Sequence, residues 1–143
     1  MDLKLPHYEE LSEQDKKLIL QTASLMIVVS KKAHEDGLLY LTEFVEESPD
    51  LFTGRAGTFL KNMVNLLSEG MIVDDFRHVA EIYVADSRSD VEYLLFNMIK
   101  DGVCALQECV STEGVASILA AYTGIDNSNA FKNSILDSSS FPS

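Results

Sequence analysis

Apolar residues recur at steps of three and four along most of this chain, and this period restricts the possible folds more than any other feature. Such steps place side chains on one face of an α-helix, whereas a half-buried strand needs strict alternation of apolar and polar residues. Alternation never lasts beyond a few residues here. We therefore predict an all-α fold, a helical bundle with two long helices and several shorter ones.

The longest stripe predicts a first helix over residues 12–47. Its face carries Leu18, Thr22, Leu25, Met26, Val29, Ala33, Gly37, Tyr40, Leu41 and Phe44. Ser12 is the expected N-cap, and Pro49 ends the helix because the residue before a proline is pushed out of the α region. Gly37 lies on the stripe, which favours close approach of a second helix, with a helix break as the alternative. On the first interpretation, Gly37→Leu overpacks this contact and costs ~1–3 kcal/mol.

A shorter helix is expected after a loop that reaches Gly57. Its apolar stripe covers 59–67, and Gly70 closes it as a residue just past the C-terminus. Two more short helices are expected near the end of the chain, over 112–122 and 127–136.

The second long helix is predicted over 74–109. Its stripe passes in phase through a polar segment, although Ser89 with Glu92 three residues later fits a capping box and would start a new helix there. One helix and two helices are equally consistent with this pattern. We expect the two long helices to pack together, with close backbone approach at Gly37, at Gly102, or at both.

The length of 143 residues indicates one domain. We expect an N-terminal arm over 1–11 and a single helical domain over 12–136. The serine-rich segment 137–143 has the composition of a flexible tail.

The charge balance restricts the partners. The chain has 23 acidic residues against 11 lysines and arginines, which gives a net charge of −12. Such a surface repels phosphate, so neither nucleic acid nor an anionic membrane is expected as a partner.

The start of the chain lacks a basic cluster followed by an apolar stretch, and the apolar runs at 25–29 and 115–122 are shorter than the ~20 residues that cross a bilayer. We expect a cytoplasmic protein.

No residue pattern indicates catalysis or a bound cofactor. The two cysteines and three histidines lack the spacing of a metal site, and the glycines at 54 and 57 lack the lysine that follows in a phosphate-binding loop. We predict a non-enzymatic protein without a cofactor or a metal.

One mixed-charge cluster remains, Lys31-Lys32-Ala33-His34-Glu35-Asp36. A solvated helix face with ion pairs between Lys32 and Glu35 or Asp36 would explain it. A docking surface for a protein partner is the other interpretation.

The segment 30–41 resembles the cytoplasmic region of the flagellar stator family, the MotA/TolQ/ExbB proton-channel family. The segments 59–70, 76–82 and 99–102 look like later parts of the same region, so the resemblance covers residues 25 to about 110. It implies a relative that lacks the channel helices, since the segments that should span the membrane are short and polar. Ion conduction is not implied.

The family uses a base and an acid on this first helix to contact the flagellar rotor. The corresponding positions here hold His34 and Thr42, with Glu43 one residue further.

We therefore predict a cytoplasmic protein-interaction module associated with the flagellar motor, whose partner is a rotor or stator component. The expected contact residues are Lys31, Lys32, His34, Glu35 and Glu43. Changing Lys31 and Lys32 to glutamate should weaken capture of an acidic patch on the partner. Whether the chain forms a homo-oligomer stays open.

The alternative is a small regulatory or ligand-binding domain with an apolar pocket. Its lining would come from the aromatic residues Tyr40, Phe44, Tyr83, Tyr93 and Phe96.

Overall fold

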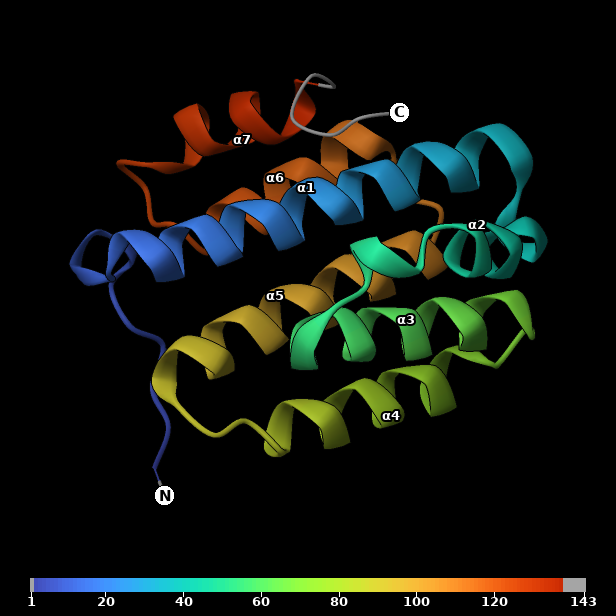
Figure 1. The fold of residues 1–143 in the computed structure, drawn as a ribbon, viewed down its shortest axis with the longest axis horizontal. Coiled ribbons are helices and arrows are strands. Elements are labelled where there is room, and N and C mark those ends of the chain that lie inside the picture. The colour runs from blue at the N-terminus through green and yellow to red at the C-terminus, as the bar shows by residue number, and fades with distance from the viewer. Residues whose placement is uncertain (1, 138–143) are drawn as a thin grey trace.

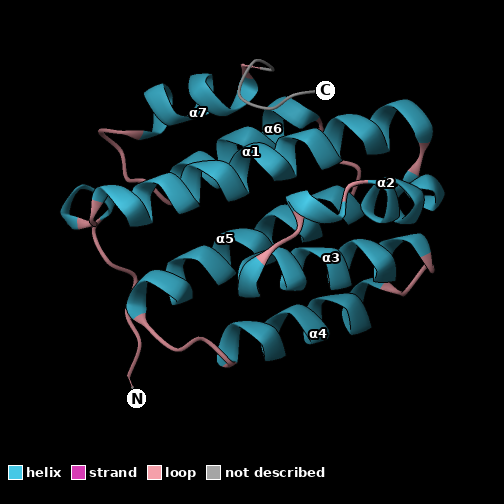
Figure 2. Ribbon diagram, in the orientation of Figure 1, coloured by secondary structure: helices cyan, strands magenta, loops and turns pink. Residues whose placement is uncertain are grey.

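The computed structural model describes residues 2–137, and no strand occurs in that range, which confirms the all-α prediction (Figure 2). The α-helices are α1 (Glu13–Asp36), α2 (Leu41–Glu47), α3 (Gly54–Ser68), α4 (Val73–Ala85), α5 (Asp90–Gln107), α6 (Thr112–Ala121) and α7 (Ser128–Leu136). The 3-10 turns are η1 (Tyr8–Glu10), η2 (Leu38–Tyr40) and η3 (Pro49–Leu51). The predicted tail, apart from Asp137, lies outside the described residues.

Helix α5 occupies the centre of the bundle. It packs against α1, α3, α4 and α6, while α7 covers α1 and α6 and α2 lies on α3 (Figure 1). The apolar stripes of these helices meet in one core, in which Met26, Met98 and Ile99 are fully buried. None of the helices in the described residues is both long enough and apolar enough to cross a bilayer.

The predicted helix over 12–47 is wrong in its last third, after Asp36. Ser12 caps α1 as expected, since its Oγ accepts a hydrogen bond of 3.1 Å from the backbone N–H of Asp15. The helix ends at Asp36, because Gly37 adopts φ +90° and ψ 160°, outside the helical region. A Cβ on Gly37 would have no atom within 4 Å, so this glycine faces open space and no helix packs against it.

The predicted helix over 74–109 is two helices that fold back on one another. Ser89 caps α5 by accepting a hydrogen bond of 3.1 Å from the N–H of Glu92, so the capping signal prevails over the in-phase stripe. Gly102 is tightly packed, but its nearest neighbours are side chains and not the backbone of another helix. A Cβ there would collide with the end of the Met26 side chain and lie 3.0 Å from Leu119 Cδ2.

The expected loop up to Gly57 is also wrong, since α3 already begins at Gly54. Gly57 packs in the first turns of α3 against the backbone of Phe52, which explains why a glycine occurs there.

The start of α3 is fastened to the turn between α4 and α5 by Arg55. Its Nε donates to both carboxylate oxygens of Glu92 at 3.0 and 3.2 Å, and its Nη2 donates to the carbonyl of Asp86 at 2.9 Å. The guanidinium also lies over the Phe96 ring, 5.5 Å from its centroid. These contacts hold the hairpin of α4 and α5 against α3.

Candidate functional site

A groove separates the end of α1 from α2, and it exists because the chain changes direction at Gly37. It encloses a cavity of about 520 Å³. The lining residues are Lys32, Glu35, Asp36, Tyr40, Glu43, Phe44 and Glu47. A straight helix over 12–47 would present these residues along one rod and form no groove.

The groove is strongly acidic. Four carboxylates line it against the single ammonium group of Lys32. The predicted ion pairs of Lys32 with Glu35 and Asp36 do not form, and within residues 2–137 no ion pair involves any carboxylate of the groove. Their negative charge is therefore directed to solvent.

Two aromatic residues supply apolar area between these charges. Tyr40 is 61% exposed, and its neighbour Leu39 is 75% exposed. Phe44 is half-buried and packs edge-on against Phe52, with 6.1 Å between the ring centroids. The groove thus combines a fixed aromatic side chain, an accessible one and an acidic rim.

The structure separates the five predicted contact residues into two sets. Lys32, Glu35 and Glu43 line the groove, but Lys31 and His34 do not. The Nε2 atom of His34 lies 3.0 Å from the carbonyl oxygen of Val110, so this side chain ties the end of α1 to the turn before α6.

Sequence reasoning left Asp36 and Glu47 out of the expected contact residues and placed Tyr40 and Phe44 in a pocket only in the alternative prediction. The only signal that could have found them was the glycine at 37, interpreted as a break. With a break there, α2 can return beside α1 and bring residues 40–47 to the charged cluster.

The five aromatic residues do not form the pocket of the alternative prediction. Tyr83 and Phe96 pack edge-on against Phe59, with centroid distances of 5.0 and 5.1 Å, and so belong to a packed aromatic cluster. A cavity of about 430 Å³ lies beside this cluster and includes Arg55 in its lining, but not Tyr93.

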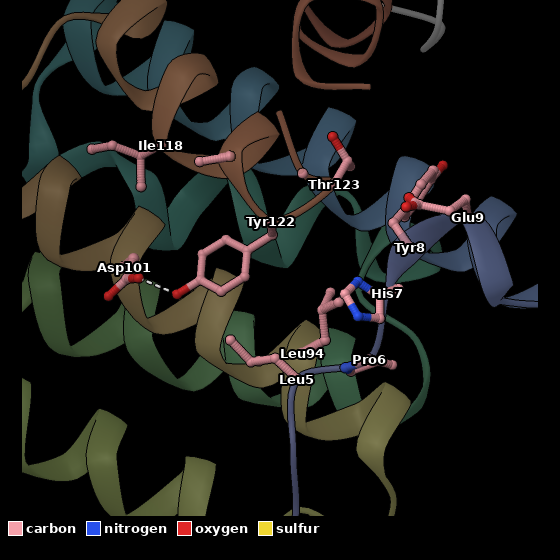
Figure 3. Close-up of a pocket in the computed structure, with 12 residues that line it drawn as sticks. Leu5, Pro6, His7, Tyr8, Glu9, Leu94, Asp101, Ile118, Tyr122 and Thr123 are labelled. Atoms are coloured by element: carbon pink, nitrogen blue, oxygen red, sulfur yellow. Dashed lines mark hydrogen bonds between the residues drawn. The ribbon is translucent and has the colours of Figure 1, made fainter. Parts of the chain in front are cut away.

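A third cavity, of about 480 Å³, lies between the N-terminal arm and the faces of α5 and α6 (Figure 3). Its walls are largely apolar and include Leu5, Leu94 and Ile118. Its polar centre is the pair formed by Asp101 on α5 and Tyr122 after α6, whose hydroxyl donates a hydrogen bond to Asp101 Oδ2. Burial is the larger cause and this hydrogen bond the smaller one by which the pKa of Tyr122 is raised above its ordinary value.

The raised pKa of Tyr122 predicts an alkaline loss of stability. Below about pH 10 the phenol is protonated in both states. As the pH rises further, the unfolded chain releases this proton while the folded chain keeps it, so unfolding becomes more favourable by at most about 1.4 kcal/mol per pH unit. In urea unfolding at about pH 10 and 11, Tyr122→Phe should lose less stability than the wild type. Equal losses would contradict this assignment.

Comparisons with family models, with curated proteins and with solved structures find no match to this chain.

Proposed function

We propose that this protein is a helical protein-interaction module, and that the groove between α1 and α2 binds a basic segment of a partner protein in the cytoplasm. The observation that carries the proposal is the combination of four unpaired carboxylates with the exposed ring of Tyr40 in one groove. No catalytic role is assigned to it.

Charge complementarity identifies the class of partner. Lysine and arginine side chains pair with carboxylates, stack on aromatic faces and are steered toward a negative surface over the Debye length. Lys32 alone cannot offset four acids, so the groove favours a basic segment over the acidic patch expected from Lys31 and Lys32. A second copy of this chain, with its net charge of −12, supplies the wrong sign of charge.

The resemblance to the stator family supports rotor and stator proteins of the flagellar motor as the first partners to test. His34 takes the position of a rotor-contacting base in that family, and here it contacts Val110 within the chain. We therefore assign the docking role to the groove carboxylates and not to His34.

The test uses a fluorescein-labelled amphipathic peptide of lysine and leucine, with a glutamate–leucine peptide of equal length for comparison. Fluorescence anisotropy should show binding of the basic peptide that weakens as salt rises from about 0.05 to 0.5 M. Glu35→Lys combined with Glu43→Lys should weaken it by at least about tenfold, equivalent to 1.4 kcal/mol. Tyr40→Ala should also weaken binding, without a change in net charge.

The matched control combines Glu46→Lys with Glu81→Lys, which changes the net charge equally at exposed residues outside the groove. This control should keep most of the affinity, and circular dichroism should show that every variant melts as the wild type does. An equal loss in both double variants, or no binding of the basic peptide, would reject the groove as the docking site.

A further inference from the structure

The cavity beneath the N-terminal arm lies at the opposite end of α1 from the groove. The groove begins at Lys32 near the end of this 24-residue helix, whereas the cavity is lined by residues 5–9, which precede the helix. The two features can therefore act independently.

The arm is held in place at both sides of the cavity. The backbone N–H of Lys4 donates to Asp90 Oδ1 at 3.0 Å, and the side chain of Asn127 donates to Glu9 Oε2 at 3.0 Å. Tyr8 packs edge-on against Phe131, with 6.0 Å between the ring centroids. The arm thus forms one wall of the cavity, and the space beneath it has the size of a small-molecule site.

The cavity has two carboxylates in its lining, those of Asp101 and Glu9, together with the imidazole of His7. No lysine or arginine is among the lining residues. Glu9 is engaged by Asn127, whereas Asp101 accepts from Tyr122 through Oδ2 alone. Within residues 2–137 no ion pair neutralises Asp101.

Figure 3 shows the Tyr122 hydroxyl directed at Asp101, with Leu5 and Leu94 close to the ring. A half-buried carboxylate between apolar walls, with no ion-pair partner in the described residues, has lost part of its hydration without gaining a charged partner. A positively charged group of a ligand next to Asp101 Oδ1 would offset this loss of hydration. The apolar walls would cover the remainder of that ligand.

We propose that this cavity binds a small organic amine, with the ammonium group on Asp101 and an apolar or aromatic body between the arm and α6. Tyr122 is a positioning residue, because it orients the carboxylate through one oxygen and leaves the other for the ligand. This site is separate from the proposed docking groove.

Three probes with the same ring and different head groups test the proposal: phenethylamine, hydrocinnamate and phenethyl alcohol. Titrations followed by protein NMR at neutral pH should show phenethylamine binding at least about tenfold more tightly than the other two. The shifted amides should include those of Leu94 and Thr123, which line the cavity.

Asp101→Asn keeps an acceptor for Tyr122 but removes the charge, and it should weaken amine binding by at least about tenfold. The matched control is Asp126→Asn, which removes the same charge from an exposed residue outside the cavity and should bind as the wild type does. Tyr122→Phe should weaken amine binding by less than Asp101→Asn does, since the charge of Asp101 stays while the hydrogen bond that orients the carboxylate is lost.

A second variant covers the case in which Asp101→Asn fails to fold. Ala121 is exposed and lines the cavity, so Ala121→Leu fills the space from α6 without altering any charge, and it should abolish binding of all three probes. Equal binding of amine, acid and alcohol, equal losses in Asp101→Asn and Asp126→Asn, or no binding by the wild type would each overturn the proposal.

Discussion

Gly57→Ala is expected to destabilise the fold by about 3 kcal/mol, although alanine is the better helix former by about 1 kcal/mol. The added Cβ would collide with the carbonyl carbon of Phe52 and lie 3.0 Å from its Cα and carbonyl oxygen. These are backbone atoms in the segment that leads into α3, so the methyl group can be accommodated only if α3 shifts away from that segment. Urea unfolding followed by circular dichroism measures the loss.

Gly102→Ala is the matched control for this prediction. Gly102 is also buried within a helix, but the atom that a Cβ would meet first is the end of the Met26 side chain. A flexible thioether can rotate away, and so this variant should lose clearly less stability than Gly57→Ala. Equal losses would show that the type of neighbouring atom does not decide the cost.

Gly37→Ala is expected to cost about 2 kcal/mol through backbone strain. With φ +90° and ψ 160°, Gly37 lies in a region that side chains with a Cβ rarely adopt. Since only the three residues of η2 separate Gly37 from α2, relief of the strain would also move α2 and deform the groove. Loss of stability in thermal unfolding together with weaker binding of the lysine–leucine peptide is the expected result.

A comparison of a small and a large side chain at position 37 distinguishes backbone strain from packing as the cause of the lost stability. A Cβ there has no atom within 4 Å, so Gly37→Leu should cost about as much as Gly37→Ala. A markedly larger loss of stability for Gly37→Leu would instead support the packing contact that the apolar stripe suggested.

The helical fold could be predicted because the apolar steps persist through nearly every helix. Ser12 and Ser89 show how far local signals extend, since each caps a helix through its own side chain. The sequence could not decide whether the helix breaks at Gly37, because the apolar residues on both sides keep the same helical phase. The helix ends through the backbone conformation of this one residue, at φ +90° and ψ 160°.

The candidate site was predictable only in its charges. Lys32 and Glu35 stood out in a mixed-charge cluster and Glu43 came from the family resemblance, but the groove depends on the direction in which α2 returns. The pair of Asp101 and Tyr122 gave no signal at all, because a spacing of 21 residues across two helices follows from packing and not from a local pattern.

The arm that covers the amine cavity can leave the domain without the unfolding of any α-helix, because it precedes α1. Its contacts join it to residues 86 and 118 positions away, and none of them belongs to the hydrogen-bond ladder of a helix. Proteins open such segments locally, with free energies well below that of global unfolding. Ligand exchange would then follow the opening of the arm, while α1 to α7 keep their backbone hydrogen bonds. A bound amine would slow hydrogen–deuterium exchange at the arm amides, because it binds only when the arm is closed.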